Sequence, residues 1–177
     1  MRDPQIKTLA ILPLRNGSKG LPGKNLKLFA GKPLYRHTLD QALRTIGHCV
    51  VTTDIPEILD ADLPSTCTVI IRPSDLAQDH TPMDPVLSHV FEQIGLSQGL
   101  PETAILLQAT SPLRSDEDIQ SAIDLHSKGE FELVLSVTRS DRGLLKHGFL
   151  AEEQFTPVSN PKFCFTNRQD LPTTVRP

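Results

Sequence analysis

Short apolar runs alternate along the chain with longer amphipathic stretches, and this alternation restricts the fold more than any other feature. The apolar runs have the length of single strands and are expected at Thr8–Pro13, Cys49–Thr52, Thr68–Ile71, Ala104–Leu107 and Leu133–Val137. Each run is almost continuously apolar, as expected for strands whose two faces are both covered by helices. The sequence therefore predicts an α/β fold around a mostly parallel sheet.

Three helices are expected between these strands. The first begins at Pro33, because proline suits the first helical position, and the second covers about residues 84–94. The third opens with Ser115, followed three residues later by Asp118, a pattern that resembles a capping box. The predicted buried residues are Tyr35, Leu39, Ala42, Leu43 and Ile46 in the first helix, Val86, Val90, Phe91 and Ile94 in the second, and Ile119, Ala122 and Ile123 in the third.

The composition argues against several classes of protein. The 177 residues carry 18 Lys and Arg against 21 Asp and Glu, a net charge of −3, whereas general nucleic-acid binders are clearly basic. No apolar run approaches the ~20 residues of a membrane span, and residues 1–14 contain no signal-peptide core. The three cysteines lack CxxC spacing, which favours free thiols over disulfides or a zinc site. We therefore expect a cytoplasmic protein without a nucleic-acid or membrane partner.

The loop after the first expected strand combines glycines with positive charge. Between positions 15 and 36 there are six cations and no acidic residue, the cations being Arg15, Lys19, Lys24, Lys27, Lys32 and Arg36. Glycines at positions 17, 20 and 23 let the backbone approach a ligand and turn its N–H groups toward phosphate oxygens. In a chain of negative net charge, such an excess at a strand end predicts an anionic ligand, namely a polyphosphate.

Neither of two familiar phosphate loops fits this segment. A Walker A loop ending at Gly23-Lys24 would need glycine at position 18 and Ser or Thr at position 25, where the chain has Ser18 and Asn25. A dinucleotide-binding GxGxxG is absent, because the three glycines are spaced by three. A basic surface turn without a ligand is the plain alternative.

The alternation of strands and helices stops after Thr138. Residues 139–177 hold four of the seven phenylalanines, together with four prolines. Such a segment cannot complete another βαβ unit, yet it is too aromatic for a solvated tail. We predict an α/β core over residues 1–138 and an arm over residues 139–177 that packs against a second copy of the chain, giving a homodimer. A hairpin folded on the chain's own core is the alternative.

Five motifs follow one another in a fixed order. They are Leu14–Asn25 with Gly31-Lys-Pro-Leu after it, Thr52-Thr53-Asp54, Arg72–Asp79, Leu107–Arg114, and Arg168–Pro172 with the ending Arg176-Pro177. Together they resemble the motifs of the CMP-sialic acid synthetases, or acylneuraminate cytidylyltransferases. The resemblance implies a three-layer, Rossmann-like nucleotidyltransferase fold with a C-terminal dimerisation arm. It also implies transfer of CMP from CTP to a sialic-type nonulosonic acid, with release of pyrophosphate.

The resemblance implies roles for individual residues at the nucleotide. CTP would be held by Leu14, Arg15, Ser18, Lys19, Lys24, Asn25 and Arg72. Arg15 and Lys24 would be catalytic, because cations neutralise charge that develops on the α-phosphate and the leaving pyrophosphate. For Arg72, a salt bridge at a strand end is the alternative.

A second group of residues would hold the sugar acid, and it consists of Gln108, Lys146, Arg168 and Arg176. An amide suits hydroxyl and N-acyl groups, whereas arginine grips a carboxylate through parallel hydrogen bonds. Solvated surface cations are the alternative for the three basic residues. At Gln108 the sequence Gln-Ala-Thr-Ser-Pro replaces the acidic run of enzymes that activate ketodeoxyoctonate, which favours a nine-carbon acid. A CMP-ketodeoxyoctonate-type synthetase is the runner-up.

Magnesium is expected from the resemblance alone. Members of the family continue for some tens of residues beyond the position of Pro177, and that part carries their Asp-x-Asp pair for magnesium. In this chain neither Asp54 nor Asp79 has metal-ligand spacing, and the six histidines are dispersed, so no metal ligand is predicted. We expect the chain to lack the C-terminal completion of the family, and a catalytically incomplete, dimer-forming nucleotide-binding module is the alternative to an active enzyme.

Overall fold

The computed structural model describes residues 6–17, 20–97 and 99–177. Ser18 and Lys19, two of the predicted nucleotide ligands, therefore lie outside the described residues. The chain divides into two compact units, Met1–Gln120 and Ser121–Pro177, and the division falls within helix α4 (Asp116–His126). The predicted boundary at residue 138 between core and arm stays a prediction.

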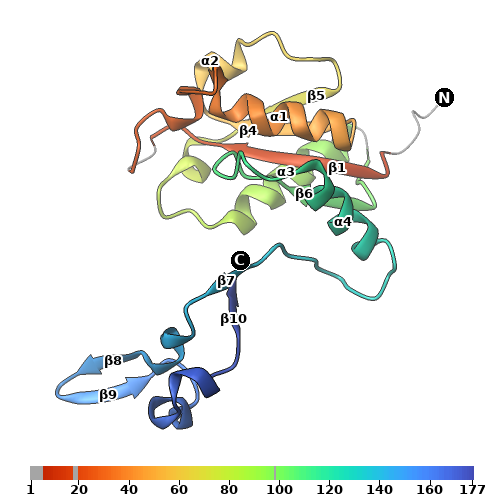
Figure 1. Ribbon diagram of the computed structural model, residues 1–177. Coiled ribbons are helices and arrows are strands. Elements are labelled where there is room, and N and C mark those ends of the chain that lie inside the picture. The colour runs from red at the N-terminus through yellow and green to blue at the C-terminus, as the bar shows by residue number, and fades with distance from the viewer. Residues whose placement is uncertain (1–5, 18–19, 98) are drawn as a thin grey trace. The chain divides into compact units, whose positions relative to one another are not determined.

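The first unit is built around a four-stranded parallel sheet (Figure 1). Its strands are β1 (Thr8–Leu14), β4 (Cys49–Thr53), β5 (Cys67–Ile71) and β6 (Thr103–Leu106), and in space they run β5-β4-β1-β6. In register, Leu12 of β1 lies beside Val51 of β4, and Ala10 lies beside Ile105 of β6. Four of the five predicted strands are thus confirmed to within one residue at each end.

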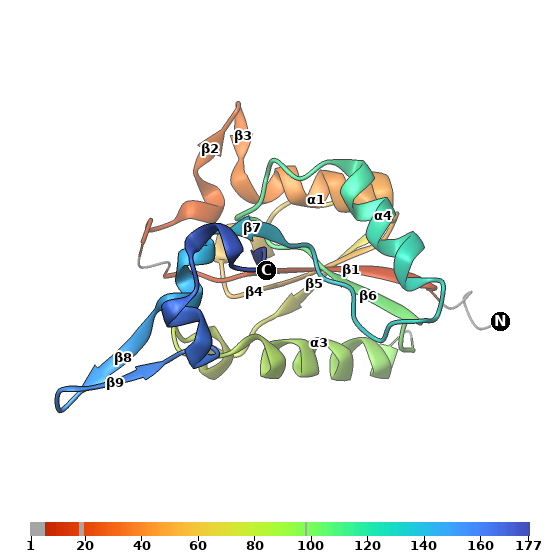
Figure 2. The same ribbon diagram turned by 60° about the horizontal axis from the view of Figure 1, so that its bottom comes forward.

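Helices cover both faces of this sheet. α1 (Leu34–Thr45) and α3 (Met83–Ser97) lie on opposite faces, as Figures 1 and 2 show together. α3 packs Val90 and Ile94 against Leu9, Ile11, Val50 and Ile70 of the sheet. The short helix α2 (Pro56–Leu59) follows β4. The result is the predicted three-layer α/β fold, in which β1 is central and almost entirely buried.

The predicted helical stripes are largely buried. Tyr35, Leu39 and Ala42 of α1 and Val86, Val90 and Ile94 of α3 are buried, whereas Leu43, Ile46 and Phe91 are half-buried. Pro33 precedes the first residue of α1 and acts as its N-cap. The first helix therefore begins one residue later than predicted.

α4 opens with the predicted capping box. The Asp118 backbone N–H donates to Ser115 Oγ at 3.1 Å, and the Ser115 backbone N–H donates to Asp118 Oδ2 at 2.9 Å. The next residue, Asp116, ties this helix to α1, because Arg44 donates to both of its carboxylate oxygens at 2.6 and 2.7 Å. Gln41 Nε2 donates to the same carboxylate at 2.9 Å. The Arg44 hydrogen bonds first, and then the Gln41 hydrogen bond, lower the pKa of Asp116 to about 2.

A small hairpin separates the first loop from α1. It consists of β2 (Leu28–Phe29) and β3 (Lys32–Pro33), preceded by the single 3₁₀ turn η1 (Lys24–Leu26). Between the two strands Ala30 and Gly31 have φ values of 45° and 87°, as the tight turn requires. His37 Nε2 lies 2.6 Å from the Phe29 carbonyl oxygen and holds the hairpin to α1.

The second unit consists of short strands and turns. β7 (Thr138–Ser140) pairs antiparallel with β10 (Thr174–Arg176), and β8 (Gly148–Ala151) forms a hairpin with β9 (Gln154–Pro157). Three 3₁₀ turns lie between them: η3 (Arg142–Lys146), η4 (Pro161–Phe165) and η5 (Arg168–Asp170). Within the described residues of this unit Leu171 is the one buried apolar side chain. The segment therefore has almost no core of its own.

The fifth predicted strand, Leu133–Val137, is wrong. The segment is irregular, and Leu133, Leu135 and Val137 are 70%, 59% and 54% exposed. An apolar run becomes a strand only where a neighbouring strand completes its hydrogen bonds. In the described residues of this unit β7 pairs with β10 and β8 with β9, which leaves no partner for the run.

The described helices include none with the length and apolar character that crossing a bilayer demands.

Candidate functional site

Polar side chains follow each strand of the parallel sheet at its carboxyl end. Arg15 comes directly after β1, Asp54 after β4 and Arg72 after β5, and Gln108 lies two residues beyond β6. Because the strands are parallel, their carboxyl ends share one edge of the sheet. The strand order changes direction between β1 and β6, and open α/β sheets bind their ligands at such a point. The candidate site is therefore the set of loops along this edge.

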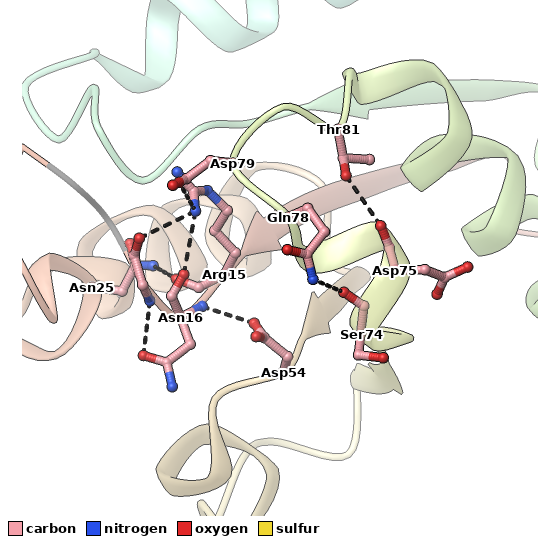
Figure 3. A network of polar contacts seen from close by, with 10 residues as sticks. Arg15, Asn16, Asn25, Asp54, Ser74, Asp75, Gln78, Asp79 and Thr81 are labelled. Atoms are coloured by element: carbon pink, nitrogen blue, oxygen red, sulfur yellow. Dashed lines mark hydrogen bonds and ion pairs between the residues drawn. The ribbon is translucent and has the colours of Figure 1, made fainter.

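The loop after β1 is anchored at both ends. The buried side chain of Asn25 donates from Nδ2 to the Arg15 carbonyl oxygen at 3.1 Å, which closes the loop on itself. The Asn16 backbone N–H donates to Asp54 Oδ1 at 2.7 Å, which ties the loop to the end of β4 (Figure 3). Gly17 and Gly23 have φ values of 68° and 64°, a left-handed conformation that favours glycine. The two ends of this loop are thus held in place by the chain itself.

Arg15 forms an ion pair with a residue from another loop. Its Nη1 lies 2.6 Å from Asp79 Oδ1, with each side chain 31% exposed, and the same nitrogen donates to the Gly17 carbonyl oxygen at 3.3 Å. Asp79 lies between the 3₁₀ turn η2 (Ser74–Ala77) and α3. The structure therefore brings the first and third sequence motifs together at Arg15 (Figure 3).

The loop that carries Asp79 is itself braced by side-chain hydrogen bonds. Gln78 Nε2 donates to the Ser74 carbonyl oxygen at 2.6 Å, and Thr81 Oγ1 donates to the Asp75 carbonyl oxygen at 3.2 Å (Figure 3). These bonds close the segment between β5 and α3 on itself. Asp79 therefore contacts Arg15 from a turn that these hydrogen bonds stabilise.

The charge of the first loop is more balanced than its sequence suggests. Besides the Arg15–Asp79 pair, Lys32 Nζ lies 2.5 Å from Asp40 Oδ2 of α1. Carboxylates of the chain thus neutralise part of the positive charge. The prediction from the sequence attributed all of that charge to binding a ligand. Lys24 and Lys27 make no ion pair within the described part of the chain, so their charges are available to an anion.

Arg72 is a buried cation beside this edge. Its side chain is 5% exposed, its Nη2 donates to the Thr52 carbonyl oxygen at 2.9 Å, and its backbone N–H donates to the Thr53 carbonyl oxygen at 2.8 Å. Burial is the main cause of the lowered pKa of its guanidinium, and the charge of Arg15 lowers it further, while Asp54 acts in the opposite direction. Its Nε has no hydrogen-bond partner among the described residues. Arg72 thus fixes the end of β4, from which Asp54 projects.

Two further predicted residues lie at the same edge. The Leu14 side chain is buried in the core, so only its backbone can face a nucleotide. Gln108 is exposed, and its Oε1 accepts a hydrogen bond from Thr110 Oγ1 at 3.3 Å. The Leu107 backbone N–H donates to the Ile11 carbonyl oxygen at 2.9 Å, which keeps the segment before Gln108 beside β1.

The remaining predicted residues belong to the second unit. Arg168 Nη2 lies 3.1 and 3.3 Å from the two carboxylate oxygens of Asp141, both side chains being exposed. Hydrogen bonding from the Gly143 backbone N–H and then the charge of Arg168 lower the pKa of Asp141. Lys146 is the last residue of η3, and Arg176 lies opposite Thr138 in the β7–β10 ladder. Their part in binding a sugar acid stays a prediction.

The described residues contain no group of three or more His, Cys, Asp or Glu side chains able to hold a metal ion. Asp54 and Asp79, the two carboxylates at the site, are engaged with the Asn16 backbone and with Arg15. Sequence reasoning weighed both only as metal ligands and missed these contacts. The signal was available, because each carboxylate lies within one of the five motifs.

The fold and the strand-end loops define a Rossmann-like α/β protein. The chain belongs to the cytidylyltransferase family, because the sequence model of that family matches residues 9–158. The family resemblance predicted from the motifs is therefore confirmed, and so is the Rossmann-like fold.

Relatives with known names are similar over much of the chain. A CMP-N,N'-diacetyllegionaminic acid synthase from Legionella pneumophila is 40% identical over 129 residues, which are 68% of this chain and 53% of that protein. An N-acylneuraminate cytidylyltransferase from Streptococcus agalactiae is 30% identical over 141 residues, 77% of this chain and 33% of that protein. A pseudaminic acid cytidylyltransferase from Campylobacter jejuni is 24% identical over 169 residues, 94% of this chain and 73% of that protein. The chain thus spans about half of the first relative and a third of the second.

Solved structures share the fold. A CMP:2-keto-3-deoxy-manno-octonic acid synthetase complexed with CTP superposes with a TM-score of 0.61 at 21% identity, covering 91% of this chain and 69% of that one. A 4-diphosphocytidyl-2C-methyl-D-erythritol synthase from Anaerococcus prevotii gives 0.55 at 16% identity, covering 96% and 67%. At these identities the likeness concerns the fold alone.

Proposed function

We propose that this chain belongs to an enzyme that joins CMP from CTP to a sialic-type nonulosonic acid and releases pyrophosphate. The observation that carries the proposal is the anchored, cationic loop Arg15–Asn25 at the carboxyl edge of the sheet, in a chain of the cytidylyltransferase family. In the reaction, the anomeric hydroxyl oxygen of the acid forms a bond to the α-phosphorus while the bond to the β-phosphate breaks. Pyrophosphate leaves with the bonding electrons, and the hydroxyl proton is lost.

Arg15 and Lys24 would stabilise the negative charge that develops on the phosphates, because cations aimed at that charge lower the barrier. Arg15 can do so once Asp79 gives up its place to a phosphate oxygen. Lys24, at the start of η1, needs no such exchange, since it has no carboxylate partner among the described residues. Asn25 keeps the loop backbone in position, whereas Ser18 and Lys19 are assigned by resemblance.

For the acid, we favour one of the N,N'-diacetyllegionaminic type. The support is the 40% identity to a relative named for that acid, against 28–35% for relatives named for N-acylneuraminate and 24% for those named for pseudaminic acid. Gln108 would contact N-acyl or hydroxyl groups, and Lys146, Arg168 and Arg176 would face the carboxylate. A ketodeoxyoctonate-type acid is the alternative, and the run Gln-Ala-Thr-Ser-Pro that begins at Gln108 disfavours it.

A homodimer is part of the proposal. Phe149, Phe155 and Phe165 are exposed on a unit that buries little apolar surface of its own. Apolar surface of this kind commonly marks an interface, and two-fold pairs are the commonest oligomers. We further propose a cytoplasmic location, in keeping with three free cysteines.

The described residues contain no preformed magnesium site, because they lack a group of three His, Cys, Asp or Glu side chains that could hold the ion. We propose that it arrives with CTP, bound chiefly by phosphate oxygens and water, as is usual for this ion.

The test is an assay of the chain with CTP, magnesium and each of three acids: N,N'-diacetyllegionaminic, N-acetylneuraminic and pseudaminic acid. Pyrophosphate release and the mass of a CMP-sugar report turnover, and thermal shifts with CTP, UTP, ATP and GTP report nucleotide preference. We expect CTP to stabilise the fold most. Binding of CTP without product from any acid would favour the incomplete-module alternative. Equal stabilisation by all four nucleotides would count against the proposed site itself.

A further inference from the structure

Two cysteines lie side by side at the amino ends of neighbouring strands. Cys49 is the first residue of β4, Cys67 is the first residue of β5, and the two are register partners in the parallel ladder. Register partners project to the same face of a sheet, and neighbouring strands lie about 4.7–4.9 Å apart. Disulfides join residues whose Cα atoms are about 4.4–6.8 Å apart. The backbone therefore already places the two residues at bonding range.

The two thiols differ in accessibility. Cys49 is 1% exposed, whereas Cys67 is half-buried and reachable from solvent. The two side chains are close enough for each to shift the pKa of the other. The more accessible thiol is therefore that of Cys67, and its register partner is buried.

The surroundings also shift the pKa values of the two thiols in opposite directions. The hydrogen bond from Cys49 lowers the pKa of Cys67, burial opposes this, and the nearby guanidinium of Arg36 lowers it further. The same hydrogen bond together with burial raises the pKa of Cys49. A thiolate therefore forms more readily on the accessible sulfur, which is the arrangement found at oxidation-prone cysteines.

We propose that Cys49 and Cys67 form a reactive dithiol that closes to an intramolecular disulfide with small disulfide oxidants such as oxidised glutathione. The Cys67 thiolate attacks one sulfur of the oxidant, forming a mixed disulfide and releasing one glutathione thiolate. The Cys49 thiol then loses its proton and attacks Cys67 Sγ, and the second glutathione thiolate leaves. In sum two protein thiols are oxidised and one glutathione disulfide is reduced to two thiols. This proposal is independent of the cytidylyltransferase activity.

The position of the pair predicts what closure does. Arg15, Asp54, Arg72 and Gln108 follow the carboxyl ends of the strands, whereas Cys49 and Cys67 begin β4 and β5 at the opposite edge of the sheet. The disulfide would link these two strands across the segment that contains α2. Such a link lowers the conformational entropy of the unfolded chain. We expect a higher melting temperature with no loss of nucleotide binding.

The sequence makes the experiment direct. Trypsin leaves both cysteines in one peptide, residues 45–114, because Arg72 precedes Pro73 and is not cleaved, and no other Lys or Arg lies between Arg44 and Arg114. It places Cys164 in a separate peptide, residues 163–168. The native chain is treated with oxidised glutathione, its remaining thiols are blocked with N-ethylmaleimide, and the digest is weighed without reduction. We expect peptide 45–114 to be lighter by two hydrogens, unlabelled, and restored by dithiothreitol. Further cleavage after glutamates should then leave residues 45–57 and 58–92 joined by the disulfide.

Single variants assign the roles. Cys67→Ser should abolish closure and leave Cys49 unmodified, whereas Cys49→Ser should stop the reaction at a glutathione adduct on Cys67. Cys164→Ser, the matched control, should close as the wild type does. The proposal is overturned if the native chain gives only glutathione adducts, if Cys164 enters the bond, or if closure requires urea. Since the wild type and Cys164→Ser carry the decisive measurement, a Cys49 variant that fails to fold leaves the test intact.

Discussion

The guanidinium of Arg15 and the carboxylate of Asp79 meet at 2.6 Å, although 64 residues separate them along the chain. The pair joins the loop after β1 to the segment before α3, and each side chain remains 31% exposed. A triphosphate that binds Arg15 offers the same kind of negative oxygen that Asp79 now supplies. On the proposed function, nucleotide binding at this loop would therefore exchange one anion for another.

Removing the competing carboxylate should strengthen triphosphate binding. Asp79→Asn retains the size of the side chain and loses its charge, so Arg15 no longer has to be released. Exposed ion pairs contribute about 0.2–1 kcal/mol, which corresponds to a gain of up to roughly fivefold in CTP affinity. Calorimetric titration with CTP in EDTA, where magnesium plays no part, measures it. Weaker binding by the variant would mean that Asp79 positions Arg15 for the nucleotide instead of competing with it.

The cations of the loop should matter for binding and little for folding. Arg15→Ala and Lys24→Ala each remove a charged contact to phosphate, and such contacts contribute about 1.5–3 kcal/mol. We expect a ten- to hundredfold loss in CTP affinity with an unchanged circular dichroism spectrum. Lys32→Ala is the matched control, because Lys32 belongs to the same run of cations and already pairs with Asp40. CTP affinity equal to that of the wild type in both loop variants would refute the assignment.

Asp116 predicts an acid-dependent loss of stability. Its pKa is lowered to about 2 in the folded chain, against about 3.9 for a free Asp side chain. The carboxylate therefore stabilises the fold above the unfolded value, and this contribution disappears as the pH falls through the folded value. The difference in melting temperature between the wild type and Asp116→Asn should be largest near neutral pH and vanish close to pH ~2. Glu117→Gln, which removes a carboxylate from the same first turn of α4, is the control for the loss of one negative charge there.

The predicted homodimer depends on exposed phenylalanines of the arm. Phe165 is 92% exposed, so a charge at this position disturbs an interface without disturbing a core. Phe165→Asp should shift the sedimentation coefficient from dimer to monomer while the melting temperature of the isolated chain changes little. Phe131→Asp, also at an exposed phenylalanine but outside residues 139–177, is the control and should remain dimeric. A wild type that sediments as a monomer at every concentration would disprove the dimer.

The strands of the sheet could be predicted because their apolar residues occupy consecutive positions, which indicates that both faces of the strand are buried. β1 and β4 are continuous apolar runs, and a central parallel strand needs such a run. The same pattern failed at Leu133–Val137, since apolar side chains show what a segment can bury and not whether a neighbouring strand is there to pair with it. Pairing depends on tertiary context, which local sequence does not contain.

The site was predictable as a loop and not as a set of contacts. Glycines and cations after β1 marked the place where a polyphosphate would bind, and the motifs assigned Arg72 and Gln108 to neighbouring strand ends. The contacts of the loop come from distant segments, namely Asp54 after β4 for the Asn16 backbone and Asp79 before α3 for Arg15. Cys49 and Cys67 illustrate the same limit, because two scattered cysteines become neighbours only through the register of β4 and β5.

The order β5-β4-β1-β6 has a consequence for how this protein can diverge from its relatives. The loops along the carboxyl edge come from separate stretches of sequence, and each can mutate while the others are retained. If residues 107–114 contact the acid as proposed, a new acid substrate would arise through changes there without disturbing the hydrogen bonds of Arg15 and Asn16. Enzymes of this fold that handle different acids should accordingly vary after β6 and agree after β1.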